Sequence, residues 1–160
     1  LLGCSRHQNW QVRRLVAELL IRHHLVPPAK LAAFLKDRHE TIRSAVITYL
    51  AQQRNKQAEE VLLTHLRCLE DTTESDDHIK ACYEALGACG SMRALPFLSR
   101  MLTGRPLREL VHSAHAAHRH GAATALGRLG LKESRQILRN AATSLFPTIR
   151  RAVSSQSSLS

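Results

Sequence analysis

Residues 78–102 read HIKACYEALGACGSMRALPFLSRML, and this stretch decides the fold. Its first part places Cys82 and Leu86 four and eight residues after His78, which is the spacing of one face of a helix. The pair Gly90-Ser91 then interrupts the pattern, because glycine and serine are typical of helix ends and turns. Apolar residues return at helical spacing as Leu95, Leu98 and Leu102. We therefore predict two helices joined by a short turn.

The opening part of this pattern recurs along the chain. Related segments are QVRRLVAELL at 11–20, TIRSAVITYL at 41–50, HRHGAATALG at 118–127 and TIRRAV at 148–153. The starts of the five segments are separated by 30, 36, 40 and 31 residues; they are Val12, Ile42, His78, His118 and Ile149. The fourth and eighth positions after the starts are apolar: Val16, Val46, Cys82, Ala122 and Val153, then Leu20, Leu50, Leu86 and Leu126. Intervals of this length are typical of stacked helix pairs.

A break and a second amphipathic segment follow each of the first four openings. The breaks are Pro27-Pro28, Arg54-Asn55, Gly90-Ser91 and Gly130-Leu131. The second segments run through Leu31, Phe34 and Leu35; Ala58, Val61, Leu62 and Leu66; Leu95, Leu98 and Leu102; and Ile137, Leu138 and Ala141. We predict a single all-α solenoid over residues 1–153, built from about four to five helix pairs. An insertion at 103–117 and a disordered tail at 154–160 complete the expected organisation.

Two units carry a more specific signature. Glu84-Ala85-Leu86-Gly87, followed by Gly90 and by Arg93-Ala94-Leu95-Pro96, resembles the HEAT-like repeats of the bilin-lyase type, and Ala125-Leu126-Gly127 with Gly130 repeats the signature. The resemblance implies an α-α superhelix with a right-handed turn, two layers of antiparallel helices, and second helices that line the concave side. It implies no single function, because such families serve lyases, scaffolds and nucleic-acid proteins. The first two units lack the small residues of the signature.

Charge is distributed unevenly along the chain. The formal net charge is +10 over 160 residues. Residues 1–80 hold 12 Lys and Arg against 10 Asp and Glu, whereas residues 81–160 hold 11 against 3. An acidic partner should therefore prefer the C-terminal half.

The cysteines favour a cytoplasmic protein. Cys82 and Cys89 lie seven residues apart in one helical pattern, roughly 10 Å along a helix axis and too far for a disulfide. We predict reduced thiols.

Glu18 interrupts the longest apolar run, so we expect no membrane span. The chain begins without Met, and we expect it to be part of a larger protein.

The second segments also carry a basic pattern. Lys132, Arg135 and Arg139 recur at three and seven residues and share one helix face, as Arg93 and Arg100 do in the preceding unit. On a concave surface these five residues would form a basic strip. We hypothesise a non-catalytic scaffold or adaptor that binds an acidic or helical segment of a protein partner there.

Other interpretations stay open. The same strip would suit the phosphates of a nucleic acid, although aromatic residues make up only 4% of the chain and disfavour stacking on single strands. A bilin-lyase-like accessory protein is the second alternative, and a charge stripe is also typical of a merely solvated helix face. Arg13, Arg43 and Arg150 are left out of the strip, because the second repeat position bridges neighbouring repeats in the family.

The segment around the insertion is rich in histidine: His112, His115, His118 and His120. Spacings of three place the first three on neighbouring helix positions, so a metal is conceivable. Only Glu109 accompanies them, and His118 stands where other units have Val12 and Ile42. We therefore predict a polar loop and a partly buried helix start, with no metal and no cofactor.

No catalytic residues are expected. His39-Glu40 invites comparison with deoxyhypusine hydroxylase, whose diiron centre uses His-Glu pairs, but His120 is followed by Gly121 and the match fails. The sequence has no Gly-rich phosphate loop, nucleophile elbow or paired-cysteine zinc spacing. We predict that the chain is not an enzyme.

The first unit raises the question of self-association. The terminal units of a solenoid expose apolar surface unless something covers them. In this chain the apolar face would consist of Val12, Leu15 and Leu19. We expect either an end-to-end homodimer or a further domain that covers this face.

Overall fold

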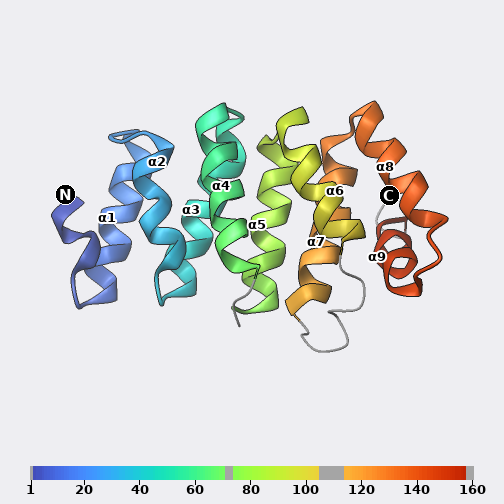
Figure 1. Ribbon diagram of the computed structural model, residues 1–160. Coiled ribbons are helices and arrows are strands. Elements are labelled where there is room, and N and C mark those ends of the chain that lie inside the picture. Colours follow the sequence, from blue (N-terminus) through green and yellow to red (C-terminus); the bar gives the residue numbers. More distant parts are fainter. Residues whose placement is uncertain (1, 71–73, 105–113, 158–160) are drawn as a thin grey trace.

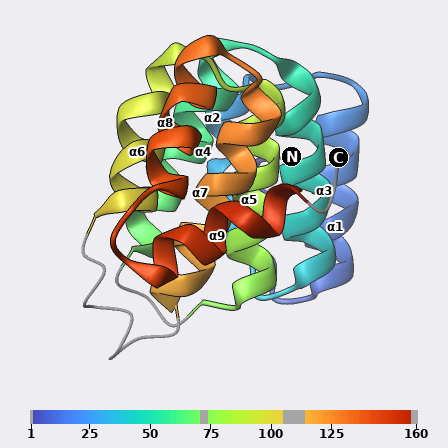
Figure 2. The ribbon, with the colours of Figure 1, turned by 90° about the vertical axis from the view of Figure 1, so that its right-hand side faces the viewer.

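The computed structural model describes residues 2–70, 74–104 and 114–157, and these form helices in two layers (Figures 1 and 2). The first layer holds α1 (Trp10–Arg22), α3 (Glu40–Gln53), α5 (Asp76–Cys89) and α7 (Ala114–Leu129). The second layer holds α2 (Pro28–Leu31) with the 3-10 helix η2 (Ala32–Lys36), α4 (Lys56–Leu69), η3 (Met92–Ala94) with α6 (Leu95–Thr103), and α8 (Lys132–Ala142). A short 3-10 helix, η1 (Leu2–Arg6), precedes α1, and α9 (Pro147–Ser157) lies across the C-terminal end of the stack (Figure 2). The predicted all-α solenoid of about four to five helix pairs is confirmed.

The predicted breaks end one helix and cap the next. The Asn55 side chain accepts a hydrogen bond from the backbone N–H of Ala58 at 2.9 Å, and Ser91 accepts one from Arg93 at 3.2 Å. These contacts satisfy donors that the first turn of a helix leaves without partners. Gly130 adopts a left-handed conformation with φ +65°, which glycine tolerates without strain. The composition of each break therefore explains where the chain reverses.

The repeat register places equivalent residues in one continuous core. Leu20, Leu50, Leu86 and Leu126 are all buried, as are the four residues one turn earlier on the same helices: Val16, Val46, Cys82 and Ala122. Val153, the fifth member of the second set, is half-buried. The helices of the first layer thus present the same face at every step, which confirms the alignment of the segments.

Three boundaries differ from the prediction. The second segment of the first unit is one turn of α-helix continued as a 3-10 helix, because η2 tightens the chain before the next unit. Helix α7 begins at Ala114, so residues 114–117 of the expected insertion are helical, and residues 105–113 lie outside the described part. Helix α9 continues to Ser157, so the prediction of a disordered tail from residue 154 is wrong up to that point. Burial of Ile149 and Ala152 anchors α9, and the polar residues after them extend a helix that is already nucleated.

Helices α5 and α7 approach each other closely where small residues replace side chains. A Cβ added to Gly121 would lie 2.4 Å from Cδ2 and 2.7 Å from Cγ of Tyr83, whose ring is buried. A Cβ added to Gly87 would lie 2.9 Å from the backbone Cα of Ala125. These distances are far inside van der Waals contact, so the spacing of the two helices depends on both glycines.

We expect Gly121→Ala to lower the free energy of unfolding by about 1 to 3 kcal/mol, because the new methyl group overpacks the core against Tyr83. Gly127→Ala, on the same helix, is the matched control, since its added Cβ would meet nothing within 4 Å. Helix propensity alone should make the control more stable by up to about 1 kcal/mol. Urea unfolding of both variants measures the difference, and equal stability of the two would contradict close packing at Gly121.

Candidate binding surface

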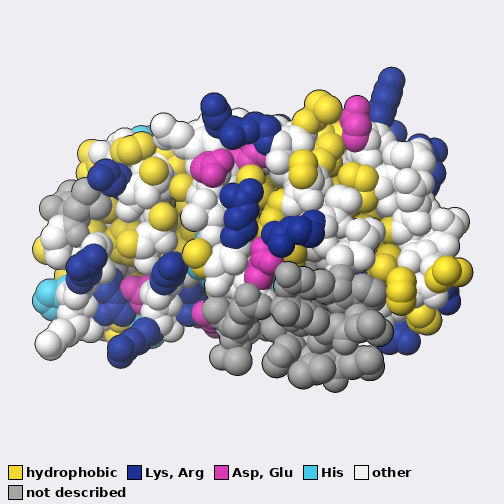
Figure 3. Space-filling view, in the orientation of Figure 1, with side chains coloured by type: hydrophobic (Ala, Val, Ile, Leu, Met, Phe, Trp, Pro, Cys, Tyr) yellow, Lys and Arg dark blue, Asp and Glu magenta, His cyan; other side chains and the backbone are white. Residues whose placement is uncertain are grey.

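The five residues of the predicted strip lie on neighbouring elements of the second layer. Arg93 belongs to η3, Arg100 to the last turn of α6, and the other three to α8, which packs beside α6. All five side chains are exposed: Arg93, Arg100, Lys132, Arg135 and Arg139. Figure 3 shows this face, with Lys and Arg next to Asp and Glu over its centre and further Lys and Arg towards α8. The strip residues thus share one face but not one electrostatic environment.

The two cations from η3 and α6 are paired with acidic residues of the preceding unit. Arg100 makes a bidentate ion pair with Glu70 at 2.6 and 3.1 Å, and its guanidinium lies 5.6 Å from the centre of the Phe97 ring. Arg93 approaches Glu60 at 3.8 Å. Arg67, which the sequence analysis did not single out, lies 5.8 Å from the same Phe97 ring. This part of the strip is partly neutralised from within the chain.

The three cations of α8 are placed differently. Within the described residues, Lys132, Arg135 and Arg139 form no ion pair, and Arg139 donates a hydrogen bond to the Gln136 side chain at 3.0 Å. Glu133 is the one acidic residue of this helix. The opposite face of α8 holds the buried Ala141 and the half-buried Ile137 and Leu138. Helix α8 therefore presents a cluster of cations that is available to a partner.

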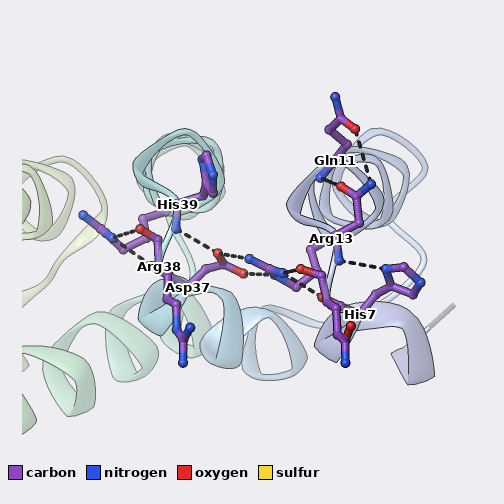
Figure 4. A network of polar contacts seen from close by, with 9 residues as sticks. His7, Gln11, Arg13, Asp37, Arg38 and His39 are labelled. Carbon is purple, nitrogen blue, oxygen red and sulfur yellow. Dashed lines mark hydrogen bonds and ion pairs between the residues drawn. The ribbon is translucent and has the colours of Figure 1, made fainter.

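The arginines at the second repeat position serve the fold instead. Arg13 makes a bidentate ion pair with Asp37 in the turn before α3, at 2.7 and 3.0 Å (Figure 4). The same guanidinium donates to the backbone carbonyls of His7 and Gln8. Hydrogen bonding from Arg13 holds the pKa of the Asp37 carboxyl below its usual value. Asp37 in turn accepts from the backbone N–H of His39 at 2.9 Å, so one carboxylate joins two neighbouring units.

Other arginines at this position make comparable contacts. Arg43 donates to the backbone carbonyls of Asp37 and Arg38 at 2.8 and 3.2 Å and approaches Glu74 at 4.0 Å. Arg150 donates to the Ser144 carbonyl at 2.7 Å. The bridging role predicted for this repeat position is confirmed for Arg13 and Arg43, and it explains why part of the large positive charge is unavailable to a partner.

The histidine-rich segment is only partly described. His112 lies outside the described residues, and the side chain of His115 is not described either. His118 is buried, as predicted for a helix start, and both of its ring nitrogens have partners: the Tyr83 hydroxyl lies 3.0 Å from Nδ1 and the Leu69 carbonyl lies 3.2 Å from Nε2. Since a carbonyl only accepts, Nε2 carries the hydrogen and Nδ1 accepts from Tyr83. His118 is therefore a structural residue of the core.

A second group of polar core residues was missed by the sequence analysis. His65 of α4 and His78 of α5 face each other with 2.9 Å between their Nε2 atoms, and Cys82 Sγ lies 3.9 Å from His78 Nε2. All three side chains are buried, and their nitrogen and sulfur atoms all lie within 4.8 Å of one another. The repeat position of Cys82 is aliphatic in the other units, and that of His78 is aliphatic in three of the other four, which was an available signal. His65 gave no signal, because its position depends on how α4 packs against α5.

The N-terminal apolar face is smaller than expected. Leu15 is 57% exposed, whereas Val12 and Leu19 are half-buried and η1 packs against α1. At the other end of the described chain, Leu145 and Phe146 are exposed. All four cysteines are free, as predicted.

Comparison with known protein families agrees with this architecture. The sequence matches the profile of HEAT repeats over residues 27–106 and that of the PBS lyase HEAT-like repeat over residues 119–144. The chain belongs to the HEAT-repeat family. HEAT repeats generally mediate protein interactions. No curated protein matches this HEAT-repeat chain at a significant level. Among the described helices, none is long and apolar enough to cross a membrane.

We expect Asp37→Asn to destabilise this HEAT-repeat chain by about 2 to 3 kcal/mol, because it leaves a largely buried Arg13 without its counter-charge. Asparagine keeps an acceptor for the His39 N–H, so the loss reports on the ion pair. Glu18→Gln, which breaks the exposed Arg14–Glu18 pair, is the control and should cost at most about 0.5 kcal/mol. Chemical unfolding of the two variants beside the wild type measures both losses, and equal losses would contradict the special role of Asp37.

The pH dependence gives a second measure of the same pair. Because the pKa of Asp37 is lower in the folded chain than in the unfolded chain, its stabilisation is present above pH 3.8 and is lost as the pH falls through the folded value. The stabilities of the wild type and Asp37→Asn should therefore converge below pH 3.8 in chemical unfolding experiments. A difference that persists undiminished into acid would contradict this assignment.

Proposed function

We propose that this HEAT-repeat chain is a non-catalytic interaction module, and that it binds an acidic segment of a protein partner on the second-layer face. The residues assigned to this surface are Arg93, Arg100, Lys132, Arg135 and Arg139. The α8 cations are its principal anchor. Arg93 and Arg100 lie on the adjoining η3–α6 surface. On binding, they exchange their present contacts with Glu60 and Glu70 for contacts with the partner.

One observation carries the proposal: the cations of α8 are exposed and, within the described part of the chain, they form no ion pair. A cation that already has an internal partner gains little from a second one, because the two carboxylates compete for the same donors. Lys132, Arg135 and Arg139 have no such competition. They also project from a helix whose other face is held by the core, so the cluster is preorganised for binding.

The pattern of charge favours a protein over a nucleic acid. The face alternates cations with Glu60, Glu70 and Glu133, and a continuous phosphate backbone would meet repulsion from each carboxylate. A peptide with separated acidic residues can place its carboxylates beside the cations and uncharged residues beside Glu60, Glu70 and Glu133. A stacked array of helices also presents several contact points along an extended segment.

The test is a fluorescence titration of the chain with an acidic peptide and with a random-sequence duplex, at low and at moderate salt. We expect the double charge reversal Arg135→Glu, Arg139→Glu to weaken peptide binding at low salt by about tenfold or more, since each reversal replaces an attraction with a repulsion. The control is Arg14→Glu, Arg22→Glu on α1, which changes the net charge equally in the first layer and should leave binding within about twofold.

The outcomes distinguish the two classes of partner. Binding of the peptide that depends on α8 supports the proposal. Duplex binding that is tighter than peptide binding and falls steeply with salt would replace it with a nucleic-acid surface, because counterion release scales with the number of phosphates contacted. Equal loss of peptide binding in the α8 variant and in the α1 control would show that only the net charge matters. It would contradict a specific binding surface on α8.

A further inference from the structure

The His65–His78–Cys82 cluster lies at the contact between two consecutive units. His65 comes from α4, in the second layer, while His78 and Cys82 lie one turn apart on α5 in the first layer. The two imidazole rings are 5.1 Å apart between centroids and nearly perpendicular. The cluster therefore brings two nitrogen donors and one sulfur donor together at one point in the core.

These residue types are unusual for the places they occupy. The repeat position of His78 is aliphatic in Ile42 and Ile149, and that of Cys82 is aliphatic in Val16 and Val46. Replacing an aliphatic side chain with a buried imidazole costs free energy unless its nitrogens gain strong partners. Among the described residues, the side-chain hydrogen bonds of His65 and His78 are made only within the cluster.

His118 shows what a purely structural histidine looks like in this chain. It occupies the same repeat position as His78 but contacts a tyrosine hydroxyl with one nitrogen and a backbone carbonyl with the other. In the His65–His78 pair the two Nε2 atoms instead point at each other, so one ring donates its Nε2–H and the other accepts it with its lone pair. Without a metal, the two rings share one hydrogen bond. With a metal ion between them, both nitrogens could act as ligands.

The donor atoms are close to the geometry that a tetrahedral metal requires. Two nitrogens about 2.1 Å from such an ion lie about 3.4 Å apart, and a nitrogen and a sulfur lie about 3.6 Å apart. The corresponding distances here are 2.9 Å between the Nε2 atoms and 3.9 Å between Cys82 Sγ and His78 Nε2. The third pair, His65 Nε2 and Cys82 Sγ, lies within 4.8 Å. The two histidines must therefore separate slightly, and His65 and Cys82 must draw closer, to hold one ion.

Charged residues lie near the buried cluster. Lys36 and Arg43 add positive charge near the cluster, and Glu74 adds negative charge.

A cavity borders one member of the cluster. A space of about 430 Å³ lies between the α2–η2 segment and α4, and His65 is part of its wall. Of the other lining residues, Ala29, Ala32, Ala33 and Val61 are apolar, and Lys36, Glu60, Thr64 and Cys68 are polar. His65 therefore borders this cavity and also contacts His78 of the cluster.

We propose that His65, His78 and Cys82 form a metal site that binds Zn²⁺ through two imidazole nitrogens and one thiolate. A set of two nitrogens and one sulfur is typical of borderline and soft ions, and Zn²⁺ accepts three protein ligands with water as the fourth. On binding, the Cys82 S–H bond breaks, a Zn–S bond forms and one proton leaves to solvent. The hydrogen shared by the histidines moves to Nδ1 of its own ring. This site was not expected from the sequence, which predicted no metal.

The ion would join α4 to α5 and so fasten the second unit to the third. Since the site exists only when both helices are packed, metal binding stabilises the folded chain by mass action. At a free Zn²⁺ concentration one hundred times Kd, we expect Tm to rise by about 5 °C or more.

The experiment uses the full chain with Cys4→Ser and Cys68→Ser, because these two thiols are exposed and would bind metal adventitiously. Co²⁺ serves as the spectroscopic probe, since a cobalt–thiolate bond gives a near-ultraviolet charge-transfer band, and Zn²⁺ should displace it. We expect one ion per chain. Calorimetric titration with Zn²⁺ in two buffers of different ionisation enthalpy should report release of about one proton.

Two variants test the ligands without disrupting the fold. Cys82→Val and His78→Ile install the residues found at the equivalent positions of other units, so both should fold with chelator present. Each should lose the Zn²⁺-dependent rise in Tm and bind at least about tenfold more weakly. Cys89→Ser, which alters the other buried thiol of α5, is the matched control and should retain the cobalt band.

The opposite results would overturn the site. A parent chain that shows neither the cobalt–thiolate band nor a rise in Tm does not bind metal at this cluster. Binding that survives Cys82→Val with unchanged affinity belongs to other histidines. Loss of the band in Cys89→Ser rather than in Cys82→Val would show that Cys89, and not Cys82, supplies the thiolate.

Discussion

The structure depends on the requirement that each first-layer helix bury two flanks, one against each neighbouring unit. A single helix pair cannot cover its own apolar surface, so the stack is stable only as a whole. The distance between neighbours is set most tightly between α5 and α7, where Gly121 lies against the Tyr83 ring and Gly87 against the backbone of α7. The same approach holds His118 where it reaches both the Tyr83 hydroxyl and the Leu69 carbonyl. The spacing of the α5 and α7 backbones therefore also determines the polar contacts of His118 in the core.

Positive charge in this chain has two separate uses, which the total of +10 does not reveal. Arg13 and Arg43 point back into the turns and satisfy carbonyl groups that a bend in the chain would otherwise leave without donors. On the second layer, Arg93 and Arg100 link units by contacts with acidic residues of α4 and its C-terminal end. The remaining exposed cations, among them those of α8, contribute to the field around the chain.

Features set by local periodicity could be predicted from the sequence, whereas features set by packing could not. The alignment of apolar positions identified the register of the first-layer helices and the breaks between helices, since both follow from the types and spacing of nearby residues in the sequence. It missed the end of α9, because burial of Ile149 carries the helix into a polar segment that has no strong preference of its own. It placed Arg93 and Arg100 on one face but could not show that Glu60 and Glu70 meet them from another unit. The contact between His65 and His78 was equally invisible, since it arises from the packing of α4 against α5.

The histidine–cysteine cluster and the proposed binding surface are connected through α4. This helix carries His65 on its buried side, and it supplies Glu60 on the side that faces Arg93. Glu70, at the C-terminal end of the same helix, holds Arg100. An ion that fixed α4 against α5 would thereby fix the acidic anchors of both arginines as well. The availability of Arg93 and Arg100 to a partner then depends on how firmly α4 is held, whereas the cations of α8 do not depend on it. If the proposed ion binds, we expect it to affect the presentation of Arg93 and Arg100 more directly than that of the α8 cations, because only the former contact acidic residues of α4 and its C-terminal end.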